Sequence, residues 1–376
     1  MKRIGIVTSI VAMLLVAFPA TAQQFQSKDE YDAYMALYNE QDPATKVELG
    51  ESFVSDFPNS EAAPIAYQLL VATHYSGRDW RSLLDVAKRF DRTFPDASDD
   101  TRSFIYRRAM AAAQQEQQPL DILEFGDKLL ELDRDNLGAM LTLPPVILDN
   151  IPGFGSARER NLQRAFDLAN RARVRAQQAY PIVGADAQQN AERVQVFSRI
   201  HLYLGQVHEL RGDDQRAAAD YARILDYDRR NSDAYLRLGL AYQRQAAALS
   251  EELAASIEAH AADPAAEPPA EPVEAANPDE ARQLDPESEA LQQAVLENLE
   301  LAIDYLASAS ALGGQAATLA QRELNAIYDT RDPESWELSC ESRPDGYICR
   351  LGAADSTVTD LNRIVTEKRA DLTRTP

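Results

Sequence analysis

The chain has 376 residues, with 60 acidic side chains against 38 basic ones and a net charge of −22 at pH 7. Such a surface repels nucleic acid and anionic lipid, because both attract basic patches, so we predict neither as a partner. Hydrophobic residues make up 45% of the chain, which is enough to bury a core and excludes global disorder.

The first 22 residues have the pattern of a secretory signal peptide. Met1-Lys2-Arg3 is basic, an apolar run extends from Ile4 to Phe18, and Ala20-Thr21-Ala22 has the small residues of a cleavage site. A membrane anchor is the alternative, but the run is short for a span of about 20 residues. No cysteine lies near the cleavage point, so nothing indicates a lipid anchor. We expect an exported, soluble chain.

Beyond residue 22, nearly every segment has the periodicity of a helix, and the helices come in pairs. Ser27 with Glu30 forms a capping box, and Asp42-Pro43 opens the next helix. Phe57-Pro58 and Phe94-Pro95 close two helices 37 residues apart. We predict helix pairs over 27–57, 60–93, 100–132, 136–178, 187–226 and 232–309, followed by a helix over 315–328.

An acidic stretch interrupts the last of these pairs. Between Ser250 and Glu289 there are 12 acidic residues, six prolines and one arginine. Pro268-Pro269 cannot lie in a regular helix, because proline lacks the backbone donor. We expect a disordered or polyproline-like linker over 263–289, inserted between the two helices of one pair.

The two cysteines, Cys340 and Cys349, flank the turn sequence Arg343-Pro344-Asp345-Gly346. A hairpin closed by this turn places residue 340 opposite 349 and residue 342 opposite 347. Thiols so close in an oxidising compartment usually pair, so we predict a disulfide. A metal site would need two further ligands, and no histidine lies nearby.

Two segments repeat one pattern at a fixed interval. Leu204-Gly205 and Leu238-Gly239 stand 34 residues apart, and Ala217 and Tyr221 follow the first of these pairs. Segment 198–231 thereby resembles the tetratricopeptide repeat (TPR) family, and segment 232–309 continues the likeness with Ala302 and Leu306 in its second helix. His201, His208 and Arg229 depart from the residues that the family prefers.

The resemblance implies an all-α fold, a TPR-like right-handed α-solenoid over 23–330. We interpret residues 331–376, with the cysteine hairpin and a helix, as a C-terminal cap over the last helix pair, which would otherwise expose an apolar face. It also implies a non-enzymatic scaffold that binds a protein or peptide through the concave face of the first helices. Tyr203, Gln206 and Arg237 are the candidate contacts on this face. The repeats also look like those of bacterial envelope proteins. With the signal peptide, this resemblance implies a soluble periplasmic protein with a protein or peptide partner, and it leaves membership of an envelope complex open.

A stripe of arginines marks the helix near residue 165. Arg160, Arg164, Arg171 and Arg175 fall within about 60° of one another on a helical wheel. The stripe could bind an acidic partner or the chain's own acidic linker. The alternative is a solvated outer face, because surface charges contribute little to stability.

The remaining polar patterns indicate no chemistry. His201 and His208 lie seven residues apart on one helical face, and the repeat explains both as packing positions rather than metal ligands. No nucleophile with a base, no cofactor motif and no metal-binding pattern is visible, so we expect no enzyme, cofactor or metal. Two alternatives to the scaffold remain: a structural subunit of an envelope complex that uses its outer surface, and a cryptic hydrolase.

Overall fold

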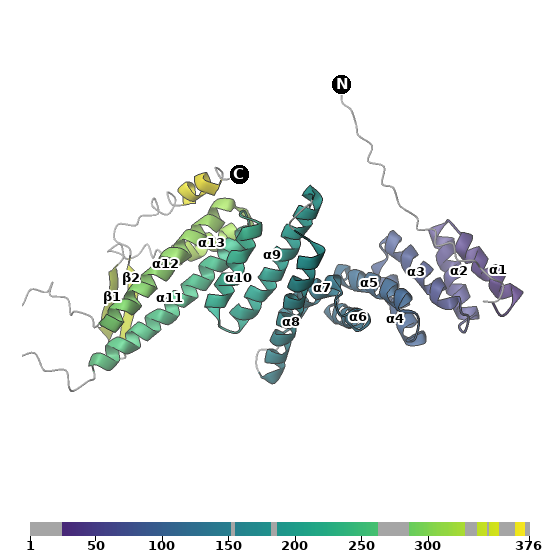
Figure 1. The fold of residues 1–376 in the computed structure, drawn as a ribbon, viewed down its shortest axis with the longest axis horizontal. Coiled ribbons are helices and arrows are strands. Elements are labelled where there is room, and N and C mark those ends of the chain that lie inside the picture. Colours follow the sequence, from purple (N-terminus) through teal and green to yellow (C-terminus); the bar gives the residue numbers. More distant parts are fainter. Residues whose placement is uncertain are drawn as a thin grey trace, which may run out of the picture. The chain divides into compact units, whose positions relative to one another are not determined.

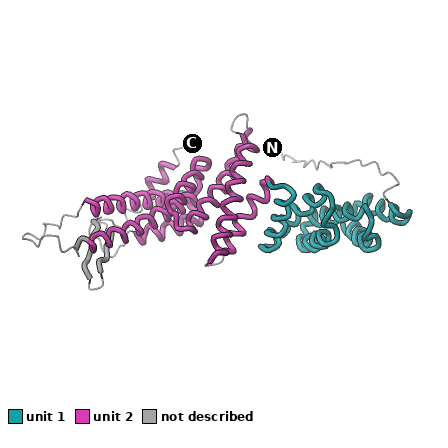
Figure 2. The backbone as a smooth tube through the Cα atoms, turned by 60° about the horizontal axis from the view of Figure 1, so that its bottom comes forward, with its two compact units in different colours: residues 1–134 teal, residues 135–376 magenta. Residues whose placement is uncertain are grey.

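The computed structural model describes residues 25–151, 155–181, 186–261, 286–327, 337–343, 346–352 and 365–372. The chain divides into two compact units, residues 1–134 and 135–376 (Figure 2). Within each unit, consecutive helices fold back on one another and pack side by side (Figure 1). The signal peptide and the acidic linker lie outside the described residues, so both stay predictions.

The first unit consists of three helix pairs. Most of these helices are capped at the N-terminus by a hydrogen-bonding side chain. The Ser27 hydroxyl accepts from the Glu30 amide (3.1 Å), and the side chains of Asp42 and Ser98 cap α2 and α5 in the same way. The Glu30 carboxylate accepts from the Gln26 amide, one residue before the partner that a capping box requires. The helices are α1 (Lys28–Asn39), α2 (Pro43–Asp56), α3 (Ala63–Gly77), α4 (Trp80–Thr93), α5 (Asp99–Gln115) and α6 (Pro119–Leu132).

The second unit contains further helix pairs, in which α8, α9, α11 and α12 are longer than any helix of the first unit, and a strand pair near its C-terminal end. All six predicted pairs are present, and α11 packs against α12 across the predicted site of insertion. The elements are α7 (Leu137–Asp149), α8 (Ser156–Ala179), α9 (Ala187–Leu210), α10 (Asp214–Tyr227), α11 (Ser232–Ala261), α12 (Pro286–Leu312), α13 (Gly314–Ile327), β1 (Glu337–Arg343) and β2 (Gly346–Gly352).

Two glycines let paired helices approach closely in the second unit. A Cβ atom on Gly205 of α9 would lie 2.4 Å from Cε1 of Tyr221 on α10. A Cβ on Gly239 of α11 would lie 2.5 Å from Cγ of Leu306 and 3.1 Å from the backbone oxygen of Ala302, both on α12. The contacts expected of a TPR-like hairpin, Leu-Gly against Ala-x₃-large, are therefore present in both pairs.

The turn between first and second helix has the same backbone in three pairs. Arg78, Gln117 and Gly212 adopt left-handed φ angles of 56°, 53° and 77°, and each stands immediately before the N-cap of the following helix. Only the last of them is glycine, the residue that tolerates this conformation best. This shared turn gives the register in which the pairs of the two units can be compared.

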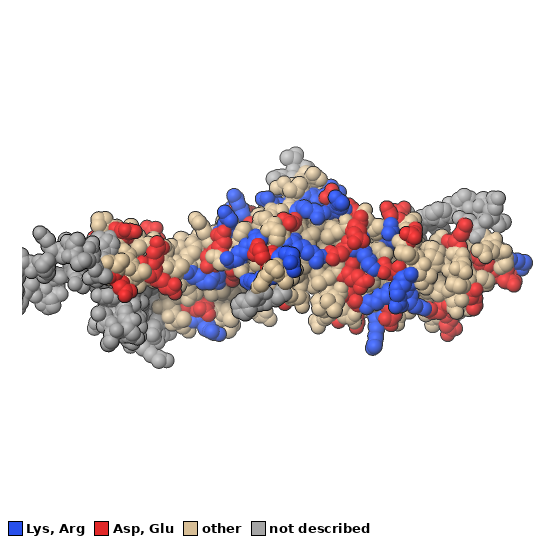
Figure 3. Space-filling model, turned by 90° about the horizontal axis from the view of Figure 1, so that it is seen from below, with Lys and Arg blue, Asp and Glu red and all other residues tan. Residues whose placement is uncertain are grey.

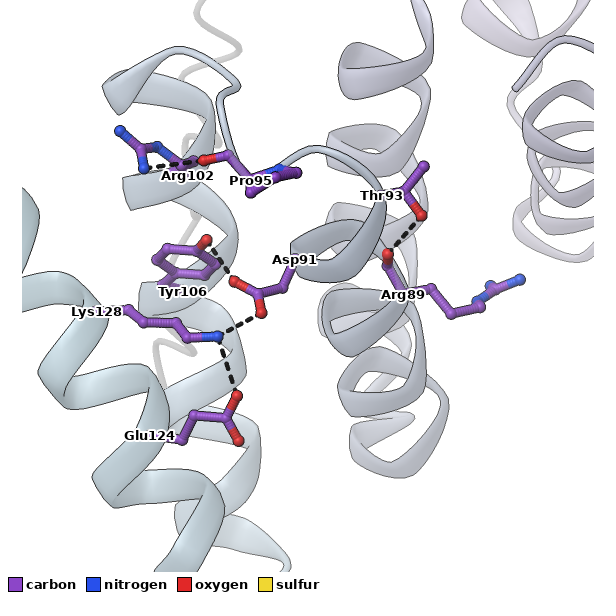
Figure 4. Close-up of polar contacts among 8 residues, drawn as sticks. All are labelled: Arg89, Asp91, Thr93, Pro95, Arg102, Tyr106, Glu124 and Lys128. Carbon is purple, nitrogen blue, oxygen red and sulfur yellow. Dashed lines mark hydrogen bonds and ion pairs between the residues drawn. The ribbon is translucent and has the colours of Figure 1, made fainter. Parts of the chain in front are cut away.

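Ion pairs connect successive second helices of the first unit. Arg89 of α4 makes a two-pronged contact with Glu51 of α2, at 2.5 and 2.8 Å. Asp91 of α4 accepts from the Tyr106 hydroxyl (2.7 Å) and pairs with Lys128 of α6 (Figure 4). Lys128 also reaches Glu124, 3.0 Å away on its own helix. These contacts are partly exposed, so packing rather than charge supplies most of the stability.

The C-terminal segments lie on the last helices of the second unit. Val365, in a helix over 365–372, packs against the buried cluster that α11, α12 and α13 form around Leu306 and Leu324. The Arg369 guanidinium donates to the Ala311 carbonyl (3.2 Å), and Lys368 pairs with Asp304. The cap expected over residues 331–376 lies only partly within the described residues, so it stays a prediction.

The strand pair has the predicted register. β1 and β2 are antiparallel, with Cys340 opposite Cys349 and Ser342 opposite Tyr347. The side chains of both strands lie outside the described residues, so the disulfide stays a prediction.

Gly205→Ala should destabilise the second unit by about 1–3 kcal/mol, because the added methyl overlaps the ring of the fully buried Tyr221. Gly77→Ala is the matched control, since a Cβ there meets nothing within 4 Å. That variant should be unchanged or more stable by up to about 1 kcal/mol. Chemical denaturation of both variants measures the difference, and equal stabilities would contradict the close contact.

If Cys340 and Cys349 are joined, the secreted chain, denatured without reductant, should react with no thiol reagent. After reduction it should expose two thiols. Cys340→Ser should show one reactive thiol without reduction. Two thiols titrating in the unreduced parent chain would contradict the predicted disulfide.

Candidate partner-binding surfaces

The structure places the three predicted groove residues in different surroundings. Tyr203 is only 6% exposed, and its hydroxyl accepts from the Arg199 guanidinium (3.2 Å). Gln206 is half-buried on the same helix. Arg237 is also half-buried, and its charge is balanced within the protein by Asp233 (3.1 Å) and Glu209 (3.6 Å). Tyr203 therefore offers a partner little surface, and Arg237 could bind one only in competition with these carboxylates.

Glu209 is the centre of an ion network that links α9, α10 and α11. Its carboxylate accepts from the Tyr221 hydroxyl (2.5 Å) and pairs with Arg244 (3.1 Å), which also contacts Asp214 (2.7 Å). Burial, together with this bond to Glu209, raises the pKa of Tyr221 well above its usual value, so the phenol keeps its proton. The network fixes α11 on α9 and α10.

The two histidines of α9 are buried and share one carboxylate. Asp220 of α10 lies 3.0 Å from Nδ1 of His201 and 3.7 Å from Nε2 of His208. The His201 ring stacks on Tyr227, and the His208 ring meets the edge of Phe166. Sequence reasoning predicted packing for both histidines but missed Asp220. Among the described residues, no group of three His, Cys, Asp or Glu side chains could hold a metal ion.

The arginine stripe lies on α8, as predicted. Arg160, Arg171 and Arg175 are exposed and Arg164 is half-buried, while Leu162, Leu168 and the alanines of the opposite side are buried. Arg171 and Arg175 line a surface pocket with Asn170, Gln178, Asp135 and Val174, a valine that is 54% exposed. We call the four arginines and Val174 the α8 arginine surface. Figure 3 shows Lys and Arg gathered on one face, over α8 and α9.

One further arginine, Arg108 of α5, was missed by sequence reasoning. Its guanidinium carbon lies 3.5 Å from the centre of the Phe104 ring and 5.6 Å from the centre of the Tyr75 ring. Aligning the helix pairs on their shared left-handed turn residue identifies it. Arg108 lies nine residues before Gln117, and Tyr203 lies nine residues before Gly212. Arg108 thus occupies a position that sequence reasoning assigned to the groove in the second unit.

No family model and no curated protein matches the sequence. Solved structures that resemble the chain include two TPR proteins. A TPR protein from Parabacteroides merdae is 9% identical, with a TM-score of 0.37 over 80% of this chain and 98% of its own. The C-terminal part of a TPR repeat-containing protein from Cytophaga hutchinsonii is 12% identical, with a TM-score of 0.35 over 80% and 96% of the two chains.

At these TM-scores the two likenesses carry no functional conclusion. The chain's own helix pairs and their glycine contacts define its class, a tandem array of TPR-like helical hairpins. Within the described residues, no helix has both the length and the apolar character needed to span a membrane.

Stability should fall as the pH drops below about 6.5, because burial lowers the pKa of His208 despite the opposing charges of Asp220 and Asp213. The unfolded chain then takes up a proton more readily than the folded one. The loss from this group can reach about 1.4 kcal/mol per pH unit, and it ends below the folded pKa. Above pH 6.5 its contribution is constant.

Urea denaturation at pH 7.5, 6.5 and 5.5 measures this loss. His208→Gln removes the titrating group, so the difference in unfolding free energy between parent and variant should shrink towards pH 5.5. A difference that stays constant across the three pH values would show that His208 titrates alike in both states.

Proposed function

We propose that this chain is an exported, non-enzymatic scaffold that binds a protein or peptide partner through the first helices of its pairs. The observation that carries the proposal is the exposure of large apolar side chains on α1 and α3. Tyr31, Tyr38, Ile65 and Tyr75 are 39%, 44%, 37% and 40% exposed. Aromatic residues that keep so much area in water are typical anchors of protein interfaces.

Several parts of this proposal rest on the sequence. Export to the bacterial periplasm follows from the signal-peptide pattern of residues 1–22, and the absence of catalysis from the lack of a catalytic motif. The TPR-like helix pairs support a role in protein interaction, because arrays of this class present extended surfaces to partners. In the cap, the predicted disulfide would hold the strand pair in an oxidising compartment.

A second candidate function is that of an assembly subunit in an envelope complex. The α8 arginine surface favours it, because its exposed Arg160, Arg171 and Arg175 stand on a chain of net charge −22. Exposed arginines beside an exposed apolar side chain are well suited to an acidic protein surface.

The test is affinity capture from an extract of the source organism with the mature chain, residues 23–376, followed by affinity measurement with the purified partner. A first-helix variant combines Tyr38→Ser and Ile65→Ser. Its matched control is Leu120→Ser, which changes a side chain that is 78% exposed on a second helix, α6. The first-helix variant should bind about tenfold more weakly or worse, and the control should bind as the parent does.

The α8 arginine surface provides the third arm, with Arg160→Gln, Arg171→Gln and Arg175→Gln combined. A partner lost by this variant and retained by the first-helix variant would establish the assembly function instead. Equal binding by every variant, or no partner in any extract, would contradict both candidates.

A further inference from the structure

Arg108 lies over two aromatic rings, and no carboxylate in the described part of the chain pairs with it. Its guanidinium covers the Phe104 ring, lies over the Tyr75 ring and donates to the Phe104 carbonyl (3.2 Å). Among the described residues, no Asp or Glu forms an ion pair with Arg108. Burial lowers the pKa of Arg108, and neighbouring Arg107 acts in the same direction. A half-buried cation without a counter-charge is unusual on a chain with 60 acidic side chains.

The second unit contains the same position with its counter-charges in place. Arg237 immediately precedes the Leu-Gly pair of α11, as Tyr203 does in α9, and Tyr203 corresponds to Arg108 through the shared turn. Four residues before each arginine stands a side chain that contacts it: Asp233 for Arg237, and Phe104 for Arg108.

The second contact is equivalent as well, and it comes from the preceding first helix. Glu209 pairs with Arg237, and Tyr75 lies against Arg108. Glu209 stands three residues before the left-handed Gly212, as Tyr75 stands three residues before the left-handed Arg78. The two carboxylates around Arg237 are therefore replaced by two aromatic rings around Arg108.

We infer that Arg108 is the binding site for a carboxylate side chain of an acidic peptide segment in the partner protein. The equivalent arginine of the second unit, Arg237, binds two carboxylates, so a carboxylate is the group that we expect Arg108 to bind. The rings hold the guanidinium by cation–π contact but cannot accept its N–H donors in the plane of the fork, where a carboxylate would bind. This inference rests on the proposed function and gives its partner a chemical class.

The surroundings of Arg108 suit a peptide better than a small anion. Tyr75 is well exposed, its ring meets the edge of the Trp80 ring at 5.4 Å, and Arg107 is exposed next to Arg108. Apolar rings beside one partly buried guanidinium favour a carboxylate carried on a chain whose other groups cover the rings. A free phosphate would bury the rings less and would call for several converging donors.

The experiment uses the mature chain, residues 23–376, with Trp336→Phe, so that Trp80 is the single tryptophan and reports on the site. The probe is fluorescein-labelled hexaglutamate with blocked ends, and hexaglutamine is its uncharged control. Anisotropy gives the affinity, Trp80 emission of the unlabelled complex gives the location, and thermal unfolding checks that each variant folds.

Arg108→Gln should weaken hexaglutamate binding by about tenfold or more, because a charge-assisted hydrogen bond is lost. Phe104→Asp should weaken it similarly, since it gives Arg108 the internal carboxylate that Arg237 has in Asp233. Arg237→Gln is the matched control at the filled position and should leave the affinity within about twofold of the parent. Hexaglutamine should bind at least about tenfold more weakly than hexaglutamate.

Three results would overturn the inference. Equal affinity of the parent and Arg108→Gln is one, and loss of binding only in the α8 arginine variant is another. Displacement of the peptide by inorganic phosphate at equal concentration is the third, because it would assign the site to small anions. If any of these occurs while the first-helix variant still loses the captured partner, the scaffold function stands and only the chemistry assigned to its partner is wrong.

Discussion

The close approach of paired helices at a glycine is the contact on which the middle of the second unit, from α9 to α12, depends. The Tyr221 ring occupies the space that a Cβ on Gly205 would need, and Leu306 does the same at Gly239. With the helices so close, Tyr221 is fully buried yet its hydroxyl reaches Glu209, the centre of the ion network. The apolar core thus forms as a strip between neighbouring helices, and some large side chains of the first helices, such as Tyr38 and Ile65, remain exposed outside this strip.

Charge is distributed unevenly on this strongly acidic chain. In the first unit, Arg89 and Lys128 pair with carboxylates of neighbouring second helices, and in the second unit Arg237 and Arg244 pair with Glu209. These cations connect helices and have little capacity left for a partner. The α8 arginine surface, with Arg160, Arg171 and Arg175 exposed to solvent, and the ring-bound Arg108 are two places in the described part of the chain where an acidic molecule could be attracted.

The helix pairs and the strand register could be predicted because their signals are local: capping residues, Phe-Pro closures, Leu-Gly pairs and one turn sequence. The side chains that contact the predicted residues from other helices could not be predicted. Asp220 faces both histidines only because α10 packs on α9, and Glu209 reaches Arg237 from a different helix. Arg108 was hidden for another reason. Ala109-Met110 stands where the second unit has Leu-Gly, so only the left-handed backbone at Gln117 reveals the register.

The helices α11 and α12 are held together by the packing of their side chains and not by a short loop between them. Its helices have 30 and 27 residues, against 14 in α10, and the added turns bury Leu253 and Val295 completely. The intervening chain has 24 residues (262–285), eight times the 3 residues (211–213) between α9 and α10. Closing so long a connection costs only about 2 kcal/mol more, at about 0.6 kcal/mol per doubling, and burial of two large side chains outweighs that cost. The contact between α11 and α12, and not the chain that joins them, therefore holds this pair together. The connection between them is the place where we would cut the chain to divide the protein into two parts that reassociate.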